Sequence, residues 1–184
     1  MDTDPGSIIV QIVILFALIF VNAFFSMSEM AIVTLNDNKI DKMAAEGNKK
    51  AKQIKKLTEN TSSFLSTIQI GVTLAGFLTS ATAAQSFAGM LAGAIAKTPI
   101  VDVIPLGVIN GFSTVLITLV MSYFSLVLGE LVPKKIAMSK PEKMAFMAAP
   151  ILVFVAKVTN PIVKFLALST NGVLRLIGID PHAD

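Results

Sequence analysis

The sequence predicts an all-α integral membrane protein with three transmembrane helices and amphipathic juxtamembrane helices on the cytoplasmic side. Of the 184 residues, 54% are hydrophobic and only 15% are charged, and the mean hydropathy is +0.75. Soluble domains carry about a quarter charged residues. Three apolar stretches also have the length of about 20 residues that a helix needs to cross a bilayer core of roughly 30 Å. We expect spans at about 7–35, 62–84 and 106–132.

The first span, 7–35, is interrupted by polar side chains. From Ile8 to Val21 it carries only Gln11 as a polar residue, and then Asn22 to Glu29 adds an amide, two hydroxyls and a carboxylate. Such groups are costly in hydrocarbon and tend to mark pathways or binding sites. The acidic start of the chain lacks the basic region of a cleavable signal, so we expect this helix to be retained.

Residues 36–60 hold seven of the fifteen basic residues, arranged around an apolar stripe. The stripe comprises Ile40, Met43, Ala44, Ala51, Ile54 and Leu57. This pattern predicts an amphipathic helix on the membrane surface, broken at Gly47-Asn48, with a solvated loop helix as the alternative.

The second and third spans are separated by a loop rich in proline and glycine. Residues 62–96 carry no charge and many small residues, so we expect a span to about residue 84, then a bend and a short helix. The third span, 106–132, ends in Gly129-Glu130 and then Pro133, which predicts a helix end or kink at Val132. For residues 144–174 we expect kinked helices along the membrane interface, divided at Pro150 and Pro161.

The distribution of charge predicts the topology and the division of the chain. Lysines crowd 36–60 and resume at Lys134, whereas 61–133 hold only Lys97. Because cytoplasmic flanks carry the positive excess, we expect a plasma-membrane protein with its N-terminus outside and its C-terminus in the cytoplasm. Residues 1–140 then form the three-span core and 141–184 the juxtamembrane helices.

Composition argues against an enzyme. The chain has no cysteine, and its one histidine, His182, lies in the C-terminal tail, so thiol chemistry, histidine zinc sites and Ser-His triads lack their residues. An intramembrane hydrolase using Ser26 or Ser28 with Lys134 as base is a weak alternative without a supporting motif. We expect no nucleic-acid partner, because juxtamembrane lysines suit anionic lipid.

The two carboxylates next to the spans, Glu29 and Glu130, both come late in helices that run inward, so we expect them at a similar depth. Ser26, Ser28 and the early residues of the second span, Ser66, Thr67, Gln69 and Thr73, match that depth. Oxygen ligands of this kind suit Mg²⁺ and Ca²⁺. The alternative is that the serines bond their own backbone and the glutamates cap the boundary or pair with Lys134 and Lys135.

Three motifs resemble the transmembrane domain of the CorC/CNNM family of magnesium transporters: Asn22 to Glu29, Thr67 to Leu74, and Gly129 to Lys134. The resemblance implies a homodimer that exports Mg²⁺, coupled to Na⁺ entry. It implies that Ser26, Ser28 and Glu130 are metal ligands, with Gln69 and backbone carbonyls of the second span as secondary ligands. The supporting residues would be Asn22, Glu29, Gly71, Thr73, Gly129, Pro133 and Lys134.

The resemblance also implies a cytoplasmic CBS-type nucleotide-binding region after the membrane domain, and none follows residue 184 in this sequence. A membrane anchor for such a sensing region, without transport of its own, is therefore the alternative function. Direction, coupling ion, and Mg²⁺ against Ca²⁺ or Mn²⁺ stay open, because the ligand types overlap.

Overall fold

The computed structural model describes residues 5–178, which are mostly helical and contain no strand. The chain runs through eight α-helices and three short helical segments of other types within this range. They are α1 (Pro5–Val33), α2 (Asp37–Ala45), α3 (Lys49–Thr58), α4 (Thr61–Ala83), η1 (Ala84–Ala88), α5 (Gly89–Ile95), η2 (Pro99–Asp102), α6 (Leu106–Leu126), η3 (Val127–Leu131), α7 (Val132–Ser139) and α8 (Pro141–Leu176).

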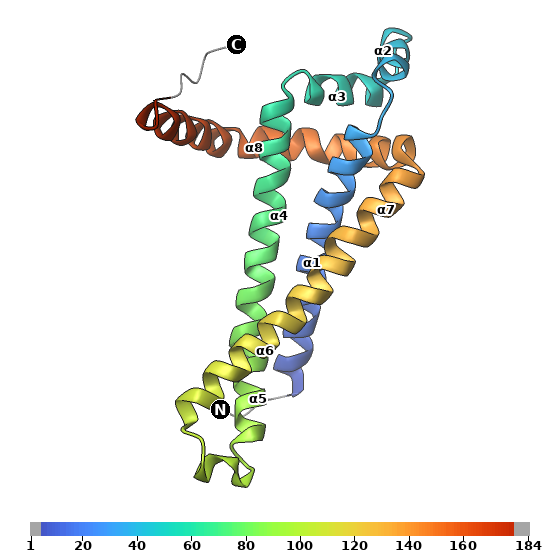
Figure 1. The fold of residues 1–184 in the computed structure, drawn as a ribbon. Coiled ribbons are helices and arrows are strands. Elements are labelled where there is room, and N and C mark those ends of the chain that lie inside the picture. The colour runs from blue at the N-terminus through green and yellow to red at the C-terminus, as the bar shows by residue number, and fades with distance from the viewer. Residues whose placement is uncertain (1–4, 179–184) are drawn as a thin grey trace.

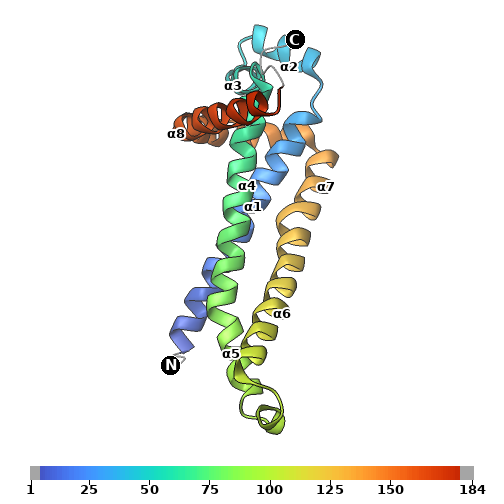
Figure 2. The same ribbon diagram turned by 60° about the vertical axis from the view of Figure 1, so that its left-hand side comes forward.

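Three long helical rods run side by side (Figures 1 and 2). The first is α1, the second continues from α4 through η1 into α5, and the third continues from α6 through η3 into α7. The first rod packs on α4 and, near its end, on η3 and α7, while α4 also packs on α6. A long helix covers each of the three expected spans, and the ends of α1 and α4 lie within a few residues of the first two predicted ranges.

A fourth helix also meets the length and hydropathy of a span. Besides Gly6–Val33, Thr61–Ile95 and Leu106–Ser139, it is α8, Pro141–Leu176. It lies across one end of the three rods rather than beside them, next to α2 and α3 (Figure 1). Length and composition therefore allow four spans, where the sequence predicted three.

The prediction of separate helices between 144 and 174 is wrong. Both prolines, Pro150 and Pro161, lie inside the single helix α8. A proline removes one helical hydrogen bond and commonly bends a helix without ending it. Near Pro150 packing compensates, because Ala145, Ala148 and Ala149 are fully buried and bring this part of α8 close to its neighbours, whereas Pro161 lies in an exposed stretch.

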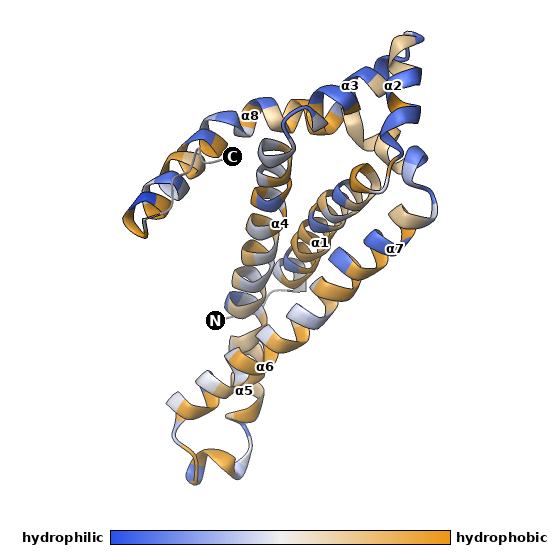
Figure 3. Cartoon of the chain, turned by 45° about the horizontal axis from the view of Figure 1, so that its top comes forward, coloured by the Kyte–Doolittle hydropathy of each residue, from blue (hydrophilic) through white to orange (hydrophobic). Residues whose placement is uncertain are grey.

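The lysine-rich segment forms the two short helices expected, α2 and α3. Between them Gly47 has φ of +97°, a conformation that favours glycine, and the Asn48 side chain caps α3 by accepting from the amides of Lys50 and Ala51. Hydrophilic residues show on the outer surface of both helices (Figure 3).

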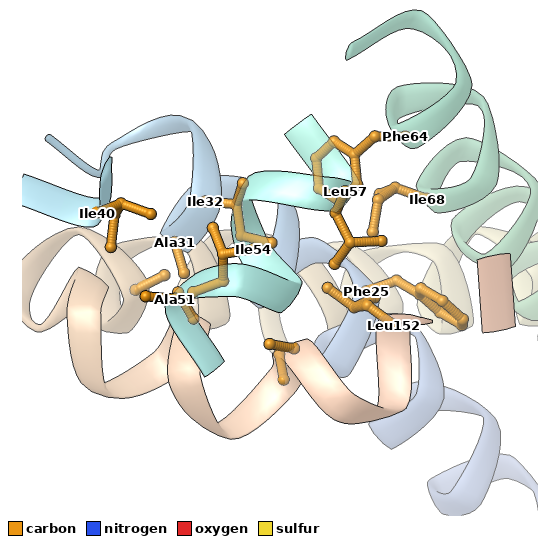
Figure 4. Packing of buried hydrophobic residues seen from close by; sticks show 14 of the residues in the cluster. Phe25, Ala31, Ile32, Ile40, Ala51, Ile54, Leu57, Phe64, Ile68 and Leu152 are labelled. Carbon is orange, nitrogen blue, oxygen red and sulfur yellow. The ribbon is translucent and has the colours of Figure 1, made fainter. Parts of the chain in front are cut away.

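The apolar stripe of α2 and α3 faces protein, which corrects the expectation that it lies on lipid. Ile40, Ala51, Ile54 and Leu57 are buried in one cluster with residues of α1, α4 and α8 (Figure 4). An ion pair from Lys39 to Glu142 joins α2 to α8. Another, from Lys55 to Asp41 at 2.7 Å, joins α3 to α2 and raises the pKa of Lys55 above its ordinary value, because the carboxylate favours the ammonium.

Candidate cation site

One face of α1 carries the polar residues of the first motif. Asn22, Ser26 and Glu29 are spaced by four and three residues, so they lie on the same side of the helix. Asn22 is 5% exposed and Ser26 is 0% exposed. Neither the Asn22 Oδ1 atom nor the Ser26 Oγ atom has a hydrogen-bond partner. Buried polar atoms are nearly always bonded, so two such oxygens one turn apart indicate a place for a ligand.

The second serine of the motif lies elsewhere. Ser28 is about 200° around the helix from Ser26, because each residue of an α-helix turns the chain by about 100°. Its hydroxyl donates to the Phe24 carbonyl at 2.6 Å, the backbone bond that the alternative interpretation expects. The hydroxyls of Ser26 and Ser28 therefore do not point to one site.

The sequence predicted a helix end or kink at Val132; the third helix does not end there but widens into the π-helix η3 just before it and continues as α7. The Val132 amide reaches back to the Val127 carbonyl. Pro133 has no N–H, so it cannot donate to Leu128, its partner in π spacing, or to Gly129, its partner in α spacing. A backbone carbonyl thus loses its usual helical donor next to Glu130. Single π-turns of this kind are frequent at functional sites.

Irregular backbone at this depth belongs to η3 and not to the second span. Because α4 is a regular α-helix over Thr61–Ala83, the carbonyls near Gln69 are engaged within the helix. The span-two carbonyls that were expected as ligands are therefore engaged in helical hydrogen bonds, whereas the third helix has a carbonyl without its usual helical donor.

Gly129 brings η3 against α1. A Cβ atom built on Gly129 would lie 2.7 Å from the Asn22 Nδ2 atom and 3.3 Å from the Asn22 Cβ atom. Contacts under about 3.5 Å are repulsive for such atoms. Only glycine permits this approach, which places the backbone beside Glu130 next to Asn22. Ser26 lies one turn further along α1. Gly71 plays a related part on α4, where its Cβ would lie 2.5 Å from the Phe25 ring.

The two carboxylates share a depth, as expected. The Lys134 Nζ atom lies 2.8 Å from Glu130 Oε1 and 3.6 Å from Glu29 Oε2. The pairing with Lys134 that the sequence left as an alternative is therefore present, whereas Lys135 makes no ion pair within residues 5–178. Pairing reduces the cost of holding charge at the edge of hydrocarbon.

The three helical rods border an open cavity of about 330 Å³ beside Glu130. Its polar lining groups come from α1, α4, α6 and η3 and are Asn22, Thr73, Ser80, Ser122, Ser125 and Glu130. The sequence reasoning missed Ser122 and Ser125. Their spacing from Glu130, eight and five residues, is a signal that could have found them, since a helix with one π-turn brings such positions near one face.

Gln69 lies outside this cavity. Its Nε2 atom donates to Thr73 Oγ1 at 3.1 Å, and it lines a second cavity of about 770 Å³ between α4 and α8. Glu29 and Ser66 share that lining. Thr73 borders both cavities, so the polar residues expected at one site are divided between two adjacent spaces.

No group of three or more histidine, cysteine or acidic side chains that could hold a metal occurs among residues 5–178. The oxygens gathered near Asn22 are instead an amide, hydroxyls, a backbone carbonyl and one carboxylate. A hard cation accepts such ligands, and Mg²⁺ commonly binds through one or two carboxylates while keeping several waters.

Comparison with known proteins places these features among related sequences. The model of the "Cyclin M transmembrane N-terminal domain" family, CNNM, matches residues 13–184. The UPF0053 protein sll0260 of Synechocystis is 41% identical over 95% of this chain and 38% of its own length. The UPF0053 protein YhdP of Bacillus subtilis is 28% identical over 82% of this chain and 33% of its own length. The UPF0053 inner membrane protein YfjD of Escherichia coli is 30% identical over 73% of this chain and 28% of its own length. The chain thus spans well under half the length of these relatives.

Proposed function

The chain belongs to the cyclin M transmembrane N-terminal domain family, and from this membership and the site we propose that it transports Mg²⁺ across the membrane. The Asn22 and Ser26 oxygens, buried without partners beside a π-turn that carries Glu130, are the observation that carries the proposal. A dehydrated or partly hydrated cation bound between α1, α4 and η3 satisfies both oxygens. We further propose that the transport is export, coupled to Na⁺ entry.

We select the proposed ligands by where the structure places their oxygen atoms. Glu130 supplies the negative charge, Ser26 and Asn22 supply uncharged oxygens, and a carbonyl of η3 completes the set. Removing the tightly held water of Mg²⁺ is costly, so a charged ligand and several dipoles are needed together. Ser28 and Gln69 are weaker ligand candidates, because a hydrogen bond within its own helix engages each side chain.

A homodimer in the plasma membrane is part of the same proposal. On α5, a Cβ built at Gly89 or Gly93 meets nothing within 4 Å, so these two exposed glycines, about one turn apart, leave a face open to another helix. Small residues permit close helix packing in membranes.

The experiment is a Mg²⁺ titration of this chain in lipid nanodiscs, paired with efflux from Mg²⁺-loaded proteoliposomes. Saturable binding in the millimolar range or tighter, lost together with efflux in Glu130→Ala and in Ser26→Ala, supports the proposal. Wild-type efflux in these two variants at normal expression removes the site from it.

A membrane anchor for a cytoplasmic sensing region is the second candidate. The platform of α2, α3 and α8 at one end of the rods, together with relatives more than twice the length of this chain, favours it. This role requires no cation between the helices. A titration with no Mg²⁺ binding at millimolar concentration, in a chain that melts cooperatively, therefore favours the anchor.

A further inference from the structure

Lys134 lies at the junction of the two cavities. Glu130, which it contacts at 2.8 Å, lines the 330 Å³ cavity between the three rods. Glu29, at 3.6 Å from the same ammonium, lines the 770 Å³ cavity under α8. All three side chains are about 30% exposed, at 27% for Lys134, 33% for Glu130 and 31% for Glu29. One ammonium thus has an acceptor in each space.

The distances show which acceptor the ammonium prefers in this state. A charge-assisted hydrogen bond has a length of about 2.8 Å, so Lys134 is fully bonded to Glu130 and is about 0.8 Å too far from Glu29. A lysine side chain has a flexible four-carbon stem with rotatable donors, so a shift of this size needs no movement of the backbone. The Lys134 ammonium therefore has only a short distance to move from one carboxylate to the other.

The charges of the three groups sum to minus one. When the ammonium is bonded to Glu130, it neutralises the carboxylate that lines the 330 Å³ cavity, so the strongest ligand for an incoming cation is already occupied. With the ammonium on Glu29, Glu130 is free, but Lys134 still stands close to any bound cation and repels it. A neighbouring positive charge weakens cation binding in either position.

We propose that Lys134 is a tethered cation that holds Glu130 in the empty transporter and moves to Glu29 when the transported ion binds. The inference rests on the proposed function and adds a positioning role for Lys134 and Glu29. The lysine keeps the empty site from carrying an unpaired carboxylate, and it lowers affinity enough for the ion to leave. Binding strength is reduced and release is accelerated by the same residue.

The test separates affinity from flux. Lys134→Gln in the nanodisc-reconstituted chain should bind Mg²⁺ at least about tenfold more tightly by calorimetry, a change of about 1.4 kcal/mol. Its export from proteoliposomes should be slower at saturating Mg²⁺, because release is impeded. Lys135→Gln makes the same charge change one residue away without an ion pair and should match wild type in both measurements. Lys134→Met serves as a second variant if Lys134→Gln does not fold.

A double-mutant cycle tests the exchange itself. Glu29→Gln removes the second acceptor, so it should weaken Mg²⁺ binding at least about tenfold when Lys134 is present and hardly at all in Lys134→Gln. If Glu29 acts only as a distant negative charge, it weakens binding equally in both backgrounds. Equal effects would overturn the exchange.

The remaining outcomes are distinct. If wild type binds Mg²⁺ but Lys134→Gln binds no more tightly, or gains affinity without loss of flux, the tethered-cation role is wrong while the transport proposal stands. If wild type itself binds no Mg²⁺, the transport proposal fails.

Discussion

Gly129→Ala tests the contact that joins α1 to η3. The added Cβ atom would lie 2.7 Å from Asn22 Nδ2, 3.3 Å from Asn22 Cβ and 3.4 Å from Asn22 Cγ. Normal separations of such atoms are about 3.5–4.0 Å, so the Asn22 amide or η3 must move by roughly 1 Å. The amide is 5% exposed and has little free space for that movement.

The magnitude follows from two opposing terms. Alanine in place of glycine favours a helix by about 0.8–1.0 kcal/mol, and overpacking a filled space costs about 1–3 kcal/mol. Gly111→Ala on α6 provides the first term alone, because a Cβ there meets nothing within 4 Å. We therefore expect Gly129→Ala to be about 1–3 kcal/mol less stable than Gly111→Ala.

Thermal unfolding of the two variants in the same detergent measures this difference. For a chain of this size about 1 kcal/mol corresponds to roughly 2–4 °C, so Gly129→Ala should melt several degrees below Gly111→Ala. Mg²⁺ affinity should fall with it, since Asn22 and Glu130 no longer keep their separation. Equal melting temperatures with unchanged Mg²⁺ binding would show that α1 and η3 are not in this contact.

Three further predictions concern packing and the two serines. Gly71→Ala should lower the melting temperature, because its Cβ would lie 2.5 Å from the Phe25 ring, and Phe25→Leu in the same chain should restore part of the loss. Ser26→Ala should change stability little, because its hydroxyl has no partner, yet it should weaken Mg²⁺ binding. Ser28→Ala should leave Mg²⁺ binding within about twofold of wild type, because its hydroxyl bonds the backbone of its own helix. The reverse pattern would exchange the roles of the two serines. Leu152→Ala should cost about 2–5 kcal/mol in denaturant unfolding, since this side chain is 1% exposed in the cluster that holds α8, and a loss below 1 kcal/mol would show that α8 is not packed there.

The order of the long helices and the extents of the first two were predictable from local pattern. Apolar runs and the Gly47-Asn48 break depend on residues close in the chain, and both are present. The sequence predicted helical structure over the range of α8 but not its continuity. Whether a proline ends or only bends a helix depends in part on what packs around it, and buried alanines surround Pro150.

The site was predictable in composition but not in geometry. Local pattern was enough to predict which polar groups interrupt the long apolar helices and that Glu29 and Glu130 lie at a similar level, because hydrophobic length and charge placement indicate the level of each residue. Only the tertiary structure decided that Ser26 and Ser28 face different ways, that Gln69 borders a separate cavity, and that Lys134 bridges the carboxylates. These outcomes depend on the rotation of each helix and on the π-turn at Gly129. Helix rotation is set by close packing such as Gly129 on Asn22, which joins residues more than 100 positions apart in the chain.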